Sequence, residues 1–170
     1  MLMSNITLYH YLSSKKYESM LEGGMLMPSA PFNSNVSEAQ WEDYSHQFSF
    51  PVARLYTCCF LEPEPQSYRD YGLFELLMEE FSGGDHLLRL NISDEVETPL
   101  LIRDHSFHSP QKYEKSVQEW RRREIRNSRP ELRQAWYQST IPLRNYDGNF
   151  ICPEVLIPFP IKISNIQIMR

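Results

Sequence analysis

Hydrophobic and polar positions along the chain predict short β-strands with a few helices between them. Runs rich in apolar, β-branched and aromatic residues, which are typical of strands, occur at residues 6–11, 54–61, 86–92, 100–102, 151–157 and 161–169. Apolar residues at helical spacing predict helices at residues 15–22, 68–81 and 111–126. Because only about three helices separate strands that gather near the two ends, we expect an α+β fold in a single domain over residues 1–170.

Residues 25–51 interrupt this pattern of regular elements. Gly23 and Gly24 precede them and are expected to end the first helix, since glycine adopts a left-handed C-cap without steric cost. The segment holds three prolines, several Asn and Ser residues, and isolated aromatic residues. Long loops of this kind are often functional, so we expect a surface excursion or a lid over one side of the fold.

The composition is that of a globular protein, with 41% hydrophobic and 23% charged residues. A net charge of −5 argues against a chain wholly given over to coating DNA or anionic lipid. Residues 121–133 depart from this charge because they contain six arginines and only two glutamates. Either a solvated helix face or recognition of phosphate, in a nucleotide or in RNA, explains this run.

The sequence predicts a protein of the cytoplasm with no membrane partner, and leaves secretion as an effector open. It contains no apolar stretch of the length that a membrane-spanning helix needs, and its first residues do not form a signal peptide. The three cysteines, Cys58, Cys59 and Cys152, make neither a disulfide framework nor a zinc site. We therefore expect a reducing environment and no bound metal.

Two polar residues stand out because each lies in an apolar strand. Glu154 alternates with Cys152 and Leu156, and a buried carboxylate is costly unless it is paired or borders a cleft. It is either a solvated edge residue or a carboxylate positioned to stabilise positive charge. His10 lies on the strand face opposite Tyr9 and Tyr11, where it serves either packing or hydrogen bonding to a ribose or phosphate.

Two stretches at opposite ends of the chain resemble one known family. Residues 8–29, LYHYLSSKKYESMLEGGMLMPS, resemble the opening of ADP-ribosyltransferase-like proteins of the H-Y-D/E type. Residues 153–166, PEVLIPFPIKISNI, resemble the last motif of that family, in which a glutamate enters an apolar strand. Together the two matches cover less than a quarter of the chain.

This resemblance implies a split β-sheet with a cleft that binds NAD as the substrate. It implies that His10 contacts a ribose and that Glu154 hydrogen-bonds the nicotinamide ribose and stabilises the ribosyl cation formed when nicotinamide leaves. The stacking aromatic residue of the family corresponds to Tyr56, Tyr68 or Tyr71 here. Further candidates for NAD binding are Tyr9, Tyr11 and Ser29.

Two departures from the family pattern bear on the reaction. Leu12 replaces a residue that usually carries a hydroxyl, and Cys152 replaces the first acidic residue of relatives that modify arginine, so an arginine acceptor is not supported. The leading hypothesis is an enzyme that transfers ADP-ribose from NAD to an unidentified protein or nucleic acid, or hydrolyses NAD. The alternatives are a non-catalytic binder of NAD, ADP-ribose or a related nucleotide, a protein-interaction domain, and an RNA 2′-phosphotransferase-type enzyme.

Three other groups carry weaker signals. Asp104, His105 and His108 have poor spacing for a metal site, although Asp104 could orient His105 as an acid/base pair. Glu62 and Glu64 alternate with prolines and are expected in an exposed turn. Cys58 and Cys59 are expected to be buried, inert thiols.

Overall fold

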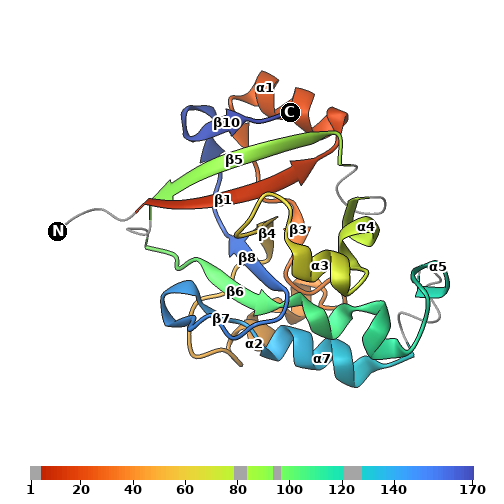
Figure 1. Ribbon diagram of the computed structural model, residues 1–170. Helices are drawn as coiled ribbons and strands as arrows, with labels where there is room; N and C mark the ends of the chain where they lie inside the picture. Colours follow the sequence, from red (N-terminus) through yellow and green to blue (C-terminus); the bar gives the residue numbers. More distant parts are fainter. Residues whose placement is uncertain (1–4, 79–83, 94–96, 121–127) are drawn as a thin grey trace.

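The computed structural model describes residues 5–78, 84–93, 97–120 and 128–170 and has the α+β architecture that the sequence predicts. Its strands form three antiparallel sheets (Figure 1). One sheet has the order β1-β5-β10, with strands Asn5–Leu12, His86–Ser93 and Ile166–Ile168. A second has the order β3-β4-β8-β6-β7, with strands Ala30–Pro31, Leu55–Cys59, Pro153–Ile157, Leu101–Asp104 and Ile141–Pro142. The third pairs β2 (Met25–Leu26) with β9 (Ile161–Lys162).

The first two sheets meet where β1 passes β4. An isolated antiparallel bridge joins Tyr9 to Phe60, just beyond the end of β4, through hydrogen bonds of 2.9 and 2.8 Å between their backbones. Figure 1 shows β1 and β5 side by side above β4, β8 and β6. The two ends of the chain therefore enter the same region, since β1 carries His10 and β8 carries Glu154.

The helices are short and lie around the sheets. Among the described residues the α-helices are α1 (Ser14–Gly23), α2 (Trp41–Ser45), α3 (Gln66–Asp70), α4 (Leu73–Leu77), α5 (Val117–Trp120) and α7 (Pro130–Gln138). The 3-10 helices are Glu38–Gln40, His105–His108, Pro110–Tyr113, Leu143–Asn145 and Ile163–Asn165. No helix within the described ranges has both the length and the apolar character that spanning a membrane requires.

The first helix begins and ends as the sequence predicts. The Ser13 hydroxyl accepts a hydrogen bond from the Lys16 amide at 3.4 Å, which satisfies one of the free donors at the start of α1. Gly24 takes a φ of 71° and its amide donates to the Met20 carbonyl. A residue with a Cβ atom would be strained in this left-handed conformation.

Two other helix predictions are wrong in their extent. The predicted helix at 68–81 is divided into α3 and α4 at Gly72, whose φ of 68° ends the first helical segment. The predicted helix at 111–126 is a 3-10 turn followed by α5, because Glu114 adopts a φ of 55° between them. Residues 79–81 and 121–126 of these predictions lie outside the described residues. Pro130 begins α7, where a missing amide hydrogen costs nothing.

Residues 25–51 are mostly exposed, but an aromatic cluster anchors them to the fold. Phe32 is only 1% exposed and its ring lies within about 5–6 Å of five other aromatic rings, those of Trp41, Tyr44, Phe48, Tyr56 and Tyr137. Aromatic pairs at such separations are attractive beyond their buried area. This segment therefore packs on the five-stranded sheet through an aromatic cluster.

The two faces of the five-stranded sheet differ in chemistry. Ile102 pairs with Val155 across β6 and β8, and both belong to an apolar core that includes Leu8 and Leu12 of β1. The next pair along the same two strands is Arg103 with Glu154. Because side chains alternate along a strand, this ionic pair lies on the face opposite the apolar core.

Candidate functional site

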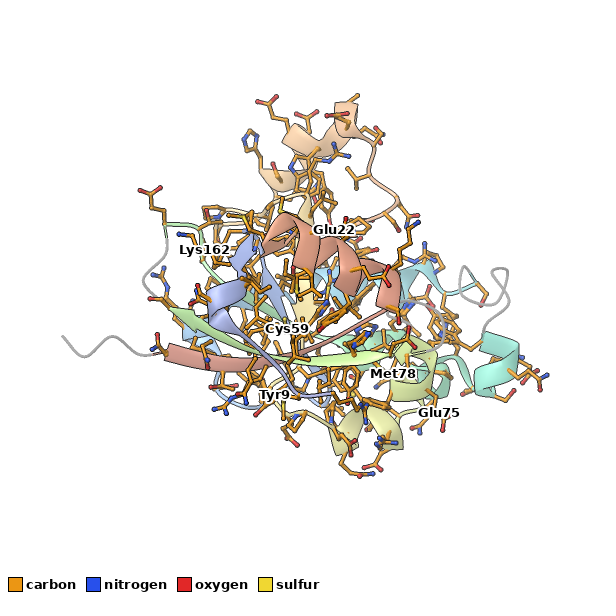
Figure 2. All side chains as sticks on the ribbon, turned by 90° about the horizontal axis from the view of Figure 1, so that it is seen from above. Tyr9, Glu22, Cys59, Glu75, Met78 and Lys162 are labelled. Carbon is orange, nitrogen blue, oxygen red and sulfur yellow. The ribbon has the colours of Figure 1, made fainter. Side chains whose placement is uncertain are left out.

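A cavity of about 820 Å³ is lined by residues from widely separated parts of the chain. Its walls include side chains of β1, α1, β4, β6, α7 and β8, together with residues 25–31. Figure 2 labels two of the lining residues, Cys59 and Met78. Both His10 and Glu154 belong to this lining, so the two polar residues singled out in the sequence lie at one cavity.

Glu154 is buried in the cavity wall, where it forms an ion pair with Arg103. The Arg103 Nε atom donates to Glu154 Oε2 at 2.7 Å, and the two residues are 2% and 6% exposed. Burial by itself raises the pKa of Glu154, but the charge of Arg103 and the contact with His105 outweigh it and hold the pKa well below its usual range. Glu154 is therefore ionised at neutral pH.

Arg103 is itself held from three sides. Its Nη1 atom donates to the Phe32 carbonyl at 3.0 Å, and its guanidinium lies 4.1 Å from the centre of the Trp136 ring. A guanidinium stacked on an aromatic face gains cation–π attraction in addition to its ion pair. These contacts hold the Arg103 guanidinium in place, and Arg103 in turn holds the Glu154 carboxylate.

Two further side chains contact the Glu154 carboxylate. His105 Nδ1 lies 3.3 Å from Oε1, in an orientation that makes an electrostatic contact rather than an aligned hydrogen bond. The Cys58 thiol hydrogen-bonds Glu154, and burial together with this carboxylate raises the pKa of the thiol well above its usual range. Cys58 is thus a protonated thiol at neutral pH, in agreement with an unreactive cysteine.

His10 contributes a neutral imidazole to the cavity. Its Nδ1 lies 2.8 Å from the Cys58 carbonyl, which can only accept, so Nδ1 carries the hydrogen. Burial lowers the pKa of His10 to about 4, although the bond to Cys58 opposes this shift. At neutral pH the other ring nitrogen, Nε2, therefore offers a lone pair rather than a hydrogen to a ligand.

The predicted binding residues divide into two groups. Tyr11, Ser29 and Tyr56 contribute to the lining of the cavity. The Tyr11 hydroxyl donates to the Pro63 carbonyl, and the Tyr56 hydroxyl accepts from the Ala53 amide. The hydroxyl groups of the two tyrosines are thus engaged with the backbone, and their rings, at 2% and 1% exposed, offer a ligand little surface.

Tyr9, Tyr68 and Tyr71 do not belong to the lining of this cavity. Tyr68 is fully buried, and its hydroxyl donates to the carbonyls of Cys152 and Pro153 at 3.1 and 3.0 Å. Tyr9, labelled in Figure 2, and Tyr71 pack against the same apolar cluster as Tyr68. These three rings are drawn into core packing, which competes successfully for large apolar side chains.

Asp104 does not orient His105. Its carboxylate accepts backbone hydrogen bonds from Ser106, Ile151 and Cys152 at 3.0–3.2 Å. These bonds tie the segment before β8 to the end of β6, so Asp104 has a structural role. Within the described residues, no group of three or more His, Cys, Asp or Glu residues could hold a metal ion.

Of three cations in the cavity, the sequence analysis missed Lys16 and Arg103 and included Arg133 only as part of the arginine-rich run. Lys16 of α1, Arg103 of β6 and Arg133 of α7 line it, and Glu154 is the single carboxylate among its described lining residues. The lining thus has a formal net charge of +2 in a chain whose net charge is −5. A signal was available for Arg103, because a buried glutamate requires a cation and Arg103 directly follows the predicted strand at 100–102.

The predicted arginine-rich segment is described only in part. Residues 121–127 lie outside the described residues. Arg129 forms an ion pair with Glu131, whereas Arg133 reaches the cavity from the helix face that also carries Trp136 and Tyr137. Residues three and four positions apart share a helix face, which explains why these three side chains line the cavity together.

Comparisons with known proteins do not assign this site. No protein-family model matches the chain, and no curated protein or solved structure matches it.

Proposed function

We propose that the protein binds a nicotinamide dinucleotide in this cavity and cleaves the bond between nicotinamide and ribose. The observation that carries the proposal is the meeting of an ionised Glu154 and a neutral His10, from opposite ends of the chain, in one cavity of about 820 Å³. That volume lies within the range of about 300–1,000 Å³ that is common for sites of small ligands and cofactors. The resemblance of residues 8–29 and 153–166 to ADP-ribosyltransferase-like proteins supports the same conclusion, and we propose that the sheets are a version of that family's split sheet.

The charge of the cavity suits a ligand that carries phosphate. Lys16, Arg103 and Arg133 give the lining its net positive charge, and the pyrophosphate of a dinucleotide carries the complementary charge. The half-buried ring of Trp136 supplies apolar surface for nicotinamide or adenine. The lone pair of His10 Nε2 can accept a hydrogen bond that a ribose hydroxyl donates.

Glu154 has the charge that the reaction requires. Departure of neutral nicotinamide leaves a positive charge on the ribosyl group, and a carboxylate about 4 Å away attracts it by about 4 kcal/mol at an effective dielectric of about 20. The charge of Arg103 repels the ribosyl cation. At about twice the distance of the Glu154 carboxylate, this repulsion is about half as large as the attraction. The net stabilisation of about 2 kcal/mol corresponds to a rate increase of about 30-fold.

Nicotinamide release from NAD⁺ tests this proposal. Glu154→Gln alone leaves Arg103 as an unpaired buried charge, so the double variant R103Q/E154Q, which removes both charges, is the informative one. We expect it to release nicotinamide about 30-fold more slowly than the wild type while unfolding near the same temperature. Glu38→Gln, at an exposed residue outside the cavity, is the matched control and should release nicotinamide at the wild-type rate.

A second candidate function is nucleotide binding without turnover. It is favoured by the engagement of both carboxylate oxygens of Glu154, one by Arg103 and the other by His105. For this candidate we expect ADP-ribose to raise the unfolding temperature although no nicotinamide is released from NAD⁺. Absence of binding by NAD⁺ and by ADP-ribose, measured by calorimetry, would contradict both candidates.

A further inference from the structure

We propose that His105 is the general base that activates the acceptor of the ribosyl group, and that this acceptor is a hydroxyl. The inference rests on the proposed cleavage of NAD⁺ and assigns the residue that completes it. His105 opens a 3-10 helix directly after β6, is 4% exposed, and lines the cavity beside Glu154.

The contact with Glu154 fixes which nitrogen of His105 is available. Nδ1 lies 3.3 Å from the ionised carboxylate, which favours the hydrogen on Nδ1 and a lone pair on Nε2. Within the described residues, Nε2 makes no hydrogen bond, so its lone pair is not consumed by the protein. A carboxylate behind one nitrogen and a free lone pair on the other is the arrangement by which an imidazole acts as a base.

The ring is held in place by its surroundings. The His105 amide donates to the Cys152 carbonyl at 2.9 Å, which joins the 3-10 helix to the residue two before Glu154. The Trp136 ring lies 4.8 Å away at 35°, and the Tyr68 ring 5.9 Å away at 69°. A base that must meet its substrate in one geometry benefits from such a rigid setting.

Two other imidazoles, those of His10 and His108, line the cavity, and that of His10 is a weak base. Burial lowers the pKa of His10 to about 4, so its lone pair has little affinity for a proton at neutral pH. Its Nδ1 donates to the Cys58 carbonyl, whereas Nδ1 of His105 faces the Glu154 carboxylate. His10 therefore suits binding, and His105 suits proton transfer.

The step balances with the groups present and a hydroxyl acceptor. The bond between the ribosyl C1′ and the nicotinamide nitrogen breaks, and its electron pair leaves with neutral nicotinamide. The acceptor oxygen forms a bond to C1′ while its proton passes to His105 Nε2, and the resulting imidazolium later releases that proton to solvent. No oxidant, reductant or metal takes part.

The charge of the site selects this acceptor class. A guanidinium or ammonium acceptor needs an unpaired carboxylate, and Glu154, the single carboxylate among the described lining residues, is paired with Arg103. A neutral hydroxyl needs no such partner, only a base to remove its proton. Water and an alcohol are the smallest members of the class.

The test compares nucleophiles that do and do not lose a proton. With NAD⁺ as donor, His105→Gln should form ADP-ribose from water and the methyl riboside from methanol about 100-fold more slowly than the wild type. Azide has no proton to lose, so H105Q should form the ribosyl azide at the wild-type rate. NAD⁺ affinity, measured by calorimetry, should not change, and His46→Gln, an exposed residue outside the cavity, should behave as the wild type with all three nucleophiles.

Each other outcome has a defined meaning. Equal methanolysis by H105Q and the wild type would overturn the role of His105 while the proposed function stands. Equal loss with methanol and azide would mean that His105 only supports the site, and would overturn the inference as well. A wild-type protein that releases no nicotinamide would overturn the proposed cleavage together with this inference.

Discussion

Asp104 and Glu154 lie at the ends of neighbouring strands and are almost equally buried, at 7% and 6% exposed, but they differ in their partners. Asp104 accepts hydrogen bonds from three backbone amides of residues 106, 151 and 152. Glu154 is contacted by the side chains of Arg103, His105 and Cys58. One carboxylate joins two chain segments, and the other belongs to the wall of a cavity.

This difference separates a structural charge from one that can act. Backbone amides cannot leave Asp104 unless the segment before β8 detaches, so its bonds contribute to folding and to nothing else. The side chains around Glu154 can rotate when a ligand supplies other partners. A buried carboxylate is therefore a candidate for function when side chains, rather than the backbone, satisfy it at a cavity.

The largest effect that this comparison predicts is on folding. Asp104→Ala removes three charge-assisted hydrogen bonds and leaves the buried Cys152 amide without its acceptor. We expect the free energy of unfolding, measured with urea, to fall by about 4 kcal/mol. Asp104→Asn keeps one acceptor oxygen and should cost about half as much; a loss below about 1 kcal/mol in D104A would show that these bonds do not hold the segment.

The next largest effect concerns the Arg103–Glu154 pair. Glu154→Gln should lower the free energy of unfolding by about 3 kcal/mol because it leaves the Arg103 charge buried without its partner. The double variant R103Q/E154Q should recover most of this loss, to within about 1 kcal/mol of the wild type. If the double variant is instead as unstable as the sum of the single variants, the two charges are not coupled as the structure implies.

A smaller effect depends on pH through His10. Its pKa falls from 6.5 in the unfolded chain to about 4 in the fold, so only the unfolded chain takes up a proton between these values. Stability is then full above pH 6.5 and is lost as the pH falls towards 4. We expect a loss of about 2 kcal/mol, reduced from the full shift by water in the cavity, and His10→Gln should abolish it.

Glu154 should add a separate loss at lower pH. Because its pKa is lowered from 4.5, its contribution to stability is full above pH 4.5 and is lost as the pH falls below that value. The double variant R103Q/E154Q should lack this component and keep that of His10. Urea unfolding between pH 3 and pH 7 separates the two, and identical curves for the wild type and both variants would contradict the assignment.

The smallest effect comes from Tyr68, which lies next to the segment that connects the Asp104 contacts to Glu154. Its hydroxyl bonds the carbonyls of Cys152 and Pro153, between the amide held by Asp104 and the carboxylate of Glu154. Tyr68→Phe should lower the free energy of unfolding by about 1 kcal/mol and leave affinity for ADP-ribose unchanged. A tenfold loss of affinity for ADP-ribose would instead show that Tyr68 takes part in binding.

The features of the fold that depend only on residues adjacent in the sequence were predictable. The first strand, the cap of α1 at Ser13 and its end at Gly24 follow from local residue types. Gly72 and Glu114 divide two predicted helices because both take a positive φ. The spacing of apolar residues, on which those predictions depended, does not show where the backbone takes a positive φ. Both features required the packed chain.

By itself, the sequence determined that His10 and Glu154 are polar residues in apolar strands, because strand patterns depend on residue type alone. Tertiary structure decided what each of them meets. Arg103 faces Glu154 only through the register of β6 against β8, and His105 reaches the same carboxylate because a 3-10 helix turns the chain there. Neither alternation along β4 nor the helical spacing of α3 shows which side chains border a cavity, so the placement of Tyr56 at the cavity and of Tyr68 in the core depended on contacts between distant segments.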